Sequence, residues 1–255
     1  MQFGFRTHGF IKWGMDRTLV ALAQIGYDGV EICLEHPDSN PIRLGDADEI
    51  EALRKLVSDA GLEITAVSYH IGTAIETISR TIEIAGELDA DVVVINGDPI
   101  PAAGKEAEWL RMVERLRKLA ERAELWRVTL AMEPEPGFML ASSADFAQLV
   151  EEVDSPVLKL NMDIGHAHIT DGGYLAWMRQ LSEHLTYLHI EDIKDGVHAH
   201  LVSGQGDLDF GALKATLDEI GYDGPYVVDL FAIQDAPDRF ARESLLALRR
   251  LWGVG

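Results

Sequence analysis

The chain has 255 residues, of which 47% are hydrophobic and 25% are charged, proportions typical of a globular protein with a substantial core. Its 43 acidic residues outnumber its 22 basic residues, which gives a formal net charge of −21. A surface this acidic would repel both the phosphate backbone of nucleic acids and anionic membranes. We therefore expect neither a nucleic-acid partner nor a membrane partner.

Cysteine content and hydropathy indicate where the protein works. Cys33 is the one cysteine, so the chain can form no internal disulfide and no zinc cluster built on cysteines. No segment approaches the roughly 18 apolar residues that a membrane span requires. The first residues also lack the features of a secretory signal. These features predict a cytoplasmic protein, and they are compatible with a homo-oligomer.

Short apolar segments alternate along the chain with longer segments in which hydrophobic residues recur at helical spacing. The expected strands span residues 2–7, 29–34, 63–70, 91–97, 128–134, 157–163, 185–191 and 225–231. The expected helices span residues 16–26, 46–60, 73–88, 104–126, 142–153, 171–183, 209–220 and 237–251. Glycines at 26, 61 and 221 stand where three of these helices would end.

Eight strand–helix units of about 32 residues each match a (β/α)₈ TIM barrel, which typically needs about 250 residues. No linker-like or low-complexity segment divides the chain. The alternative is an open doubly wound sheet, but the Gly-x-Gly-x-x-Gly turn expected after its first strand is absent. We predict a single TIM-barrel domain over residues 1–255.

The C-terminal ends of TIM-barrel strands meet at one mouth, where the chemistry of such enzymes takes place. Most of the expected strands end in a polar or ionisable residue: Glu31, His70, Asn96, Glu133, Asp163, His189 and Asp229. Four of these come from consecutive strands and could reach one point, namely Glu133, Asp163, His189 and Asp229. Alone, each is more often a helix cap, a rim residue or a core histidine. Together, three carboxylates and one imidazole predict a site for Mn²⁺ or Mg²⁺, with Co²⁺ or Zn²⁺ as alternatives.

Several segments resemble one family: GYDGVEI, LAMEPEPG, NMDIGHAH, YLHIEDIKDGVHAHLVSGQGDLDF and GPYVVDLF. They resemble the xylose-isomerase-like TIM barrels, which include sugar isomerases and epimerases, inosose dehydratases and apurinic endonucleases. The resemblance covers nearly the whole chain and implies the same four metal ligands. The fourth ligand of the family is more often Glu, so Asp229 is a departure that would shift either the metal or its reach to substrate.

The resemblance also gives roles to the histidines that follow these ligands. In sugar-processing relatives the histidine that matches His166 contacts substrate oxygens, and we expect His166 and His200 to bind substrate. In the endonuclease branch the matching histidine holds an additional zinc, which would here give a second metal site of His166, His198 and His200. A complete three-zinc centre would need a histidine where this chain has Asn96.

Four further residues are expected at the substrate site: His70, Glu31, Arg6 and Trp13. His70 could orient a substrate hydroxyl or support a metal ligand, and a hydrogen bond within the barrel is an equally good interpretation. Glu31 could meet substrate, or it could bond to Arg6 or to a histidine. Trp13 could close over a sugar face or simply pack.

This set of residues favours proton abstraction next to a carbonyl. A divalent ion would stabilise the enediolate, and Glu133 and Asp229 would act as base and acid. We predict a metal-dependent isomerase or epimerase that acts on a small-molecule sugar or sugar derivative. The alternative is a dehydratase of an inosose-like cyclic ketone. An apurinic endonuclease is disfavoured by the net charge, and a non-catalytic binding barrel by the four ligand types.

Overall fold

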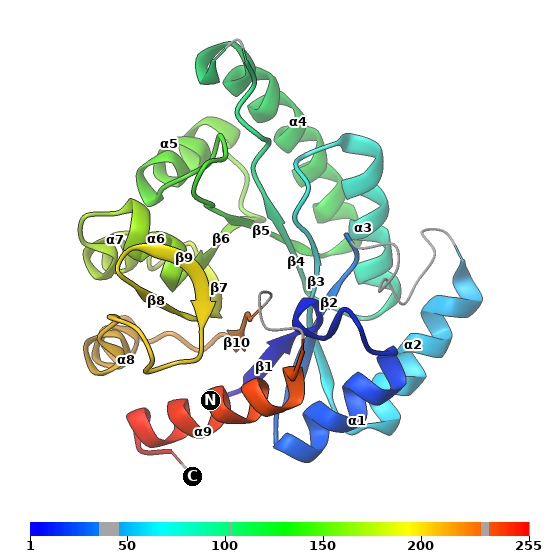
Figure 1. Cartoon of the computed structure of the whole chain (residues 1–255). Coiled ribbons are helices and arrows are strands. Elements are labelled where there is room, and N and C mark those ends of the chain that lie inside the picture. Colours follow the sequence, from blue (N-terminus) through cyan, green and yellow to red (C-terminus); the bar gives the residue numbers. More distant parts are fainter. Residues whose placement is uncertain (36–45, 103, 231–234, 255) are drawn as a thin grey trace.

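Eight parallel strands close into a barrel in the computed structural model of this chain, which describes residues 1–35, 46–102, 104–230 and 235–254. The barrel strands are β1 (Phe3–Arg6), β2 (Gly29–Cys33), β3 (Glu63–Tyr69), β4 (Val92–Asn96), β5 (Thr129–Glu133), β6 (Leu158–Asp163), β7 (Leu185–Ile190) and β10 (Tyr226–Val228). They follow one another around the barrel in this order, and β10 pairs with β1 to close it. The predicted TIM barrel is confirmed (Figure 1).

Helices connect the strands and surround the barrel (Figure 1). They are α1 (Met15–Ile25), α2 (Ala47–Asp59), α3 (Ile75–Glu87), α4 (Lys105–Trp126), α5 (Ser143–Val153), α6 (Ile164–Thr170), α7 (Tyr174–Gln180), α8 (Phe210–Glu219) and α9 (Pro237–Trp252), with a 3-10 helix η1 (Thr7–Phe10) after β1. Each expected helix has a counterpart, whereas α6 and η1 were not predicted. The last expected strand segment ends at residue 231, which lies outside the described residues. None of the described helices has the length and apolar character needed to cross a bilayer.

Local sequence signals account for several helix ends. Ser142 and Asp145 form a reciprocal capping box at the start of α5, in which each side chain accepts a hydrogen bond from the other's backbone N–H. Gly26 adopts a left-handed conformation (φ 103°) directly after α1, a conformation that glycine adopts without steric cost.

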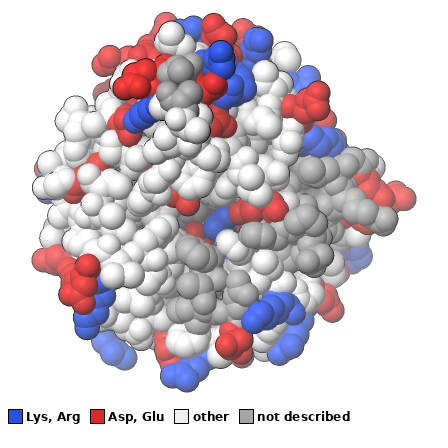
Figure 2. Space-filling view, turned by 45° about the horizontal axis from the view of Figure 1, so that its top comes forward, with Lys and Arg blue, Asp and Glu red and all other residues white. Residues whose placement is uncertain are grey.

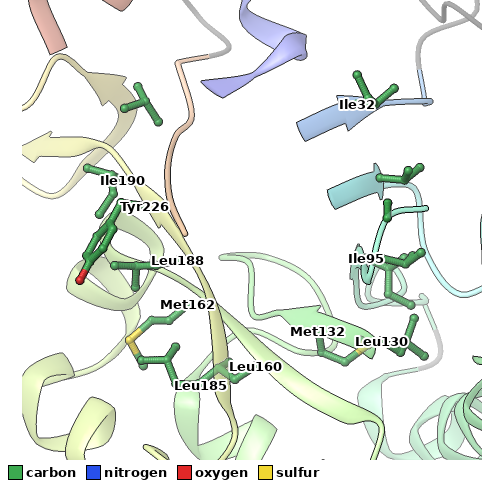
Figure 3. Packing of buried hydrophobic residues seen from close by; sticks show 14 of the residues in the cluster. Ile32, Ile95, Leu130, Met132, Leu160, Met162, Leu185, Leu188, Ile190 and Tyr226 are labelled. Carbon is green, nitrogen blue, oxygen red and sulfur yellow. The ribbon is translucent and has the colours of Figure 1, made fainter. Parts of the chain in front are cut away.

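Side chains of each strand alternate between the helices and the barrel interior, as the period of a β-strand requires. Residues such as Ile95, Met132 and Leu160 belong to the main hydrophobic core (Figure 3). A separate, smaller cluster contains the intervening residues Ala66, Val94, Ala131, Tyr187 and Val227. The strands are therefore buried on both faces.

The same alternation positions the polar residues of the mouth. Each of four residues of this smaller cluster is followed two positions later by a polar residue. The pairs are Val94 and Asn96, Ala131 and Glu133, Tyr187 and His189, and Val227 and Asp229. All four of these polar residues are buried. The polar mouth is therefore the next layer of side chains above a packed apolar interior.

A β-hairpin follows β7 and was not predicted. It consists of β8 (Asp192–Lys194) and β9 (Val197–Leu201), which pair in antiparallel fashion. The buried Asp192 carboxylate accepts hydrogen bonds from the backbone N–H groups of Gly204 (2.8 Å), Gly206 (2.7 Å) and Leu208 (3.2 Å). The glycine-containing segment after β9 therefore directs its N–H groups at Asp192, which ties down the hairpin that carries His198 and His200.

We expect the substitution Asp192→Ala to lower the free energy of unfolding by on the order of 3 kcal/mol, because several backbone N–H groups, including that of the buried Leu208, would lose their charged acceptor together. Urea denaturation followed by circular dichroism measures the change. Asp218→Ala is the matched control, because this exposed carboxylate makes only an (i, i+4) ion pair with Lys214 and should change stability by less than about 0.5 kcal/mol. Equal effects of the two substitutions would contradict the role given to Asp192.

Candidate active site

A cavity of about 210 Å³ lies at the C-terminal ends of the barrel strands. Acidic and basic side chains meet in a hollow at the centre of the face shown in Figure 2. The cavity is lined by Arg6, His8, Glu35, His70, Ile71, Glu133, Glu135, His166, His200 and Asp229. The structure thus brings residues from distant parts of the chain, including most of the predicted site residues, to one concave surface.

The four predicted metal ligands are distributed over three overlapping clusters at this mouth. Within each cluster the possible ligand atoms lie within 4.8 Å of one another. Glu133 and Asp163 share a cluster with His166. Asp163 and Asp229 share a second with His200, and His189 shares a third with Glu133 and His70. The described residues therefore offer several groups that could hold a metal ion.

The ring of His189 is fully buried between two carboxylates. Its Nε2 lies 2.7 Å from Glu31 Oε2, and its Nδ1 lies 3.0 Å from Glu133 Oε2. Burial opposes a charge on this ring, but the two carboxylates outweigh burial and raise the pKa of His189 well above its ordinary value. Glu31 therefore does not line the cavity; it fixes the orientation of His189 from behind, as the outer carboxylate partner of a metal-binding histidine commonly does.

Arg6 holds the mouth together from β1. Its guanidinium group lies 3.0 Å from Glu31 Oε1 and 3.1 Å from Asp229 Oδ2, and it also contacts Glu35. Arg6 Nη2 further lies 2.7 Å from Nδ1 of His70, whose Nε2 is 2.9 Å from Glu133 Oε2. Arg6 was predicted to bind substrate. It lines the cavity, and its guanidinium group also hydrogen-bonds to the protein's own acids and to His70.

Buried oxygens without a donor show where a cation fits. Asp163 Oδ1 accepts from the N–H groups of Gly165 (2.8 Å) and His166 (2.9 Å) at the start of α6. Within the described part of the chain, Asp163 Oδ2 and Asp229 Oδ1 are buried without a hydrogen-bond donor. Unpaired buried carboxylate oxygens are costly, and a divalent cation would satisfy them. The carboxylates of Asp163 and Asp229 therefore suit a divalent cation, and Glu133 shares a possible metal group with Asp163. His189 shares such a group with Glu133 and His70, and both of its ring nitrogens contact carboxylates in this arrangement.

His166, His198 and His200 converge beside this first set. Nε2 of His198 lies 2.9 Å from Nε2 of His166 and 2.8 Å from Nε2 of His200. The Nδ1 atoms of His166 and His200 lie 3.2 Å and 3.1 Å from the carbonyl oxygens of Pro134 and Asp229, respectively. An Nδ1–H that donates to a carbonyl leaves the Nε2 lone pair to face the centre of the group, which is the usual arrangement of a metal-binding histidine.

Glu191 joins the three histidines, and the sequence analysis missed it. Its carboxylate lies 3.1 Å from His200 Nδ1, and the four residues form one cluster that could hold a metal ion. Burial, followed by the charge of Asp163, raises the pKa of Glu191 well above its ordinary value. A Cβ atom at Gly165 would lie 2.0 Å from Glu191 Oε1, so the glycine in NMDIGHAH makes room for this carboxylate. The signal was available, since Glu191 stands two residues after His189.

Trp13 does not reach the cavity. Its ring packs edge-on against Phe10, and the guanidinium group of Arg17 lies 3.3 Å from the ring centroid. Trp13 is half-buried and packs against the core, so the structure places it in a packing role rather than over a substrate. Glu31 and Trp13 are thus the predicted substrate residues that the structure does not bring to the cavity.

Three other polar residues at or near the cavity were also missed. Asn161, two residues before Asp163, donates to Glu133 Oε2 (2.7 Å). Glu35 binds Arg6, whose positive charge helps to outweigh burial and lowers the pKa of Glu35. Glu135 lines the cavity, and burial together with the charge of Glu133 raises its pKa. Strand periodicity could have found Asn161, but Glu35 and Glu135 lie beyond the strand ends, where periodicity gives no signal.

Comparison with known proteins assigns a family. The model of the xylose isomerase-like TIM barrel matches residues 19–251. The chain belongs to this family. The predicted resemblance is thereby confirmed.

Curated relatives of this xylose isomerase-like barrel are distant in sequence. L-ribulose-5-phosphate 3-epimerase UlaE of Salmonella paratyphi C is 24% identical over 224 residues, which cover 82% of this chain and 79% of the relative. Fructoselysine 3-epimerase of Shigella flexneri is 23% identical, and the match covers 98% of both chains. Both are curated as epimerases.

Solved structures show the same fold. D-psicose 3-epimerase from Clostridium cellulolyticum H10, solved with D-tagatose, has a TM-score of 0.84 at 18% identity and covers 99% of both chains. The IOLI protein, solved with a bound zinc atom, has a TM-score of 0.85 at 20% identity, covering 99% of this chain and 98% of that one. At these identities the likeness establishes the fold alone.

Removing the outer partner of His189 should weaken metal binding without removing a ligand. We expect Glu31→Gln to lower the affinity for Mn²⁺ by about 10- to 100-fold. His189→Ala should lower it further. Isothermal titration of metal-free protein with Mn²⁺ measures both changes. Glu219→Gln, at an exposed ion pair with Arg179, is the control and should bind Mn²⁺ like the wild type. Unchanged affinity in both site variants would show that the ligands are misassigned.

Proposed function

We propose that this chain is a divalent-metal-dependent epimerase of a small ketose or ketose derivative. The observation that carries the proposal is the pair of carboxylates Glu133 and Asp229, which line one cavity beside residues suited to a metal ion. The reaction would be the removal of a proton from the carbon next to a carbonyl and its return to the opposite face.

Glu133, Asp163, His189 and Asp229 would hold the ion, with Mn²⁺ or Mg²⁺ preferred by an oxygen-rich set and Co²⁺ or Zn²⁺ as alternatives. When bound, the ion would supply Lewis-acid stabilisation of negative charge on the substrate oxygens. Glu31 and Asn161 would support this set, because they contact the ring nitrogens of His189 at 2.7 and 3.1 Å.

The two proton-transfer groups stand on different sides of the ligand set. Glu133 ends β5 and Asp229 follows β10, with β6 and β7 between these strands in the barrel. Hydrogen bonds from His70 and Asn161 hold Glu133 Oε2. The Arg6 guanidinium group holds Asp229 Oδ2, and Asp229 Oδ1 has no donor within the described residues. Carboxylates fixed at two sides of a bound carbon can serve as base and acid on its two faces.

The relatives favour epimerisation over the other outcomes of the same first step. The curated relatives are named for epimerisation of L-ribulose 5-phosphate and fructoselysine, and a structural neighbour for that of D-psicose. Each of these compounds is a ketose or a ketose derivative. Isomerisation, or dehydration of an inosose-like ketone, would begin with the same proton abstraction, so product analysis must accompany any exchange assay.

Replacement of either carboxylate should slow exchange of the substrate proton with solvent. We expect Glu133→Gln and Asp229→Asn to reduce deuterium incorporation at C3 of a ketose by about 10²- to 10⁴-fold, the usual contribution of a positioned acid or base. NMR of D-fructose, D-psicose, D-tagatose and L-ribulose in deuterated water with Mn²⁺ measures the rate and identifies the product. Glu219→Gln should exchange like the wild type. Exchange within threefold of the wild type in either site variant would remove that carboxylate from the mechanism.

The three histidines and Glu191 support the further proposal of a second cation. Histidines whose Nε2 atoms converge are suited to a borderline metal such as Zn²⁺, and two of these three, His166 and His200, are buried. Burial lowers the pKa of both His198 and His200, and the neighbouring His166 lowers each further, which favours the neutral ligand form. In this arrangement the ion would lie beside the first one.

Metal content separates the one-ion and two-ion arrangements. We expect elemental analysis of protein equilibrated with Zn²⁺ to give two ions per chain, and His198→Ala to lower the content to one, because His198 belongs to the second cluster alone. His184→Ala is the control, since His184 lies outside these clusters. One ion per chain in the wild type would leave the histidines as substrate-binding residues.

A further inference from the structure

Glu135 lines the cavity but belongs to neither metal cluster and has no part in the proposed proton transfer. It stands two residues after Glu133 in LAMEPEPG, beyond the end of β5. Glu133 is almost completely buried, whereas Glu135 is partly exposed, so Glu135 lies nearer the opening. A substrate held at Glu133 by its reacting carbon would extend toward Glu135 with its other end.

The position of the Glu135 side chain is fixed by a buried relay. Asn96 Nδ2 donates to Glu135 Oε2 (2.7 Å), and Asn96 Oδ1 accepts from the backbone N–H of Gly72 (3.0 Å). Asn96 is completely buried at the end of β4, so the direction of its amide is set by the fold. Among the described residues no donor hydrogen-bonds to Glu135 Oε1, and the side chain lines the cavity, so this oxygen is an available acceptor.

The backbone around Glu135 is equally well anchored. The N–H of Glu135 donates to the carbonyl of Leu140 (2.8 Å), and its carbonyl accepts from Phe138 N–H (3.1 Å). Phe138 forms an antiparallel bridge with Pro99, and Met139 N–H donates to the carbonyl of Asp98 (2.9 Å). The carboxylate is therefore presented by a hydrogen-bonded turn rather than by an unsupported loop.

Charge at this end of the cavity disfavours an anionic substituent. Of the described lining residues, Arg6 is the one Lys or Arg, and its guanidinium group already contacts Glu31, Glu35 and Asp229. The carboxylates of Glu133 and Glu35 outweigh burial and raise the pKa of His70 to about 9, but its ring is already paired with them. Among the described lining residues, a phosphate near Glu135 would therefore face a carboxylate while Arg6 and His70 are engaged by other acids. A hydroxyl group would instead donate a charge-assisted hydrogen bond to Oε1.

We propose that Glu135 is a specificity-determining residue that accepts a hydrogen bond from the terminal hydroxyl of an unphosphorylated ketose and excludes a phosphate ester from the same position. The inference rests on the proposed function, since it takes the reacting carbon to lie at Glu133 and Asp229. It separates this chain from the curated relatives named for a sugar phosphate.

Three matched probes test the assignment: L-ribulose, 5-deoxy-L-ribulose and L-ribulose 5-phosphate, which differ only at C5. Calorimetric titration of the Mn²⁺-loaded protein gives the dissociation constant of each. We expect the wild type to bind L-ribulose at least about tenfold more tightly than either analogue, as a lost charge-assisted bond and a like-charge contact require. Glu135→Ala should bind L-ribulose and its 5-deoxy analogue within about threefold of each other, and Glu135→Gln should lower the preference over the phosphate by about tenfold.

Two further variants complete the test. Asn96→Ala should reduce discrimination between L-ribulose and the 5-deoxy analogue, and circular dichroism should show that this variant keeps the wild-type fold. Glu76→Gln, an exposed carboxylate in the first turn of α3, should keep the wild-type preferences and so controls for net charge. Equal penalties for the missing hydroxyl in wild type and Glu135→Ala would overturn the assignment. So would a wild-type preference for the phosphate ester.

These outcomes are distinct from a failure of the proposed function. Suppose that the wild-type chain exchanges deuterium into L-ribulose but that removal of the C5 hydroxyl weakens binding equally in the wild type and in Glu135→Ala. This result refutes the role of Glu135 and leaves the proposed function standing. A wild-type chain that neither binds nor exchanges any of the three probes refutes the substrate class, and the assignment of Glu135 fails with it.

Discussion

The mouth of this barrel concentrates negative charge where water is excluded. The buried carboxylates there are Glu31, Glu35, Glu133, Asp163, Glu191 and Asp229. Like charges in a medium of low dielectric constant repel strongly unless cations or shared protons offset them. Arg6 and the ring of His189 supply part of that compensation through direct contacts. Asp163 and Asp229 each keep a buried oxygen without a donor among the described residues, and a bound cation would offset the charge that remains.

The rest of the structure serves to hold these charges at fixed separations. A closed barrel provides a rigid ring of strand ends, and its apolar interior layer supports the polar layer directly above it. Asp192 fixes the hairpin that brings His198 and His200 over the same mouth. The Asn96–Glu135 relay extends the fixed geometry outward to the part of the cavity where the far end of a substrate would lie.

Strand periodicity and the positions of strand ends were enough to predict much of this from the sequence. Because side chains alternate along a strand, Glu133, Asp163, His189 and Asp229 could be placed at one mouth without any coordinates. Periodicity could not show that both ring nitrogens of His189 contact carboxylates, because that depends on Glu31 from β2, a strand that does not neighbour β7. It also could not place residues beyond the strands: Trp13 packs on Phe10 and Arg17, whereas Glu135 turns into the cavity. The contacts of such residues are decided by loop hydrogen bonds such as those of Asn96 and Asp192.

The most direct test of the account is the location of a bound metal ion. Crystals of the wild-type protein grown with Mn²⁺ should be measured by anomalous diffraction at the manganese edge. The account predicts a peak within coordination distance, about 2.0–2.3 Å, of atoms of Glu133, Asp163, His189 and Asp229 together. A peak bound elsewhere, with His189 still held between Glu31 and Glu133, would contradict it.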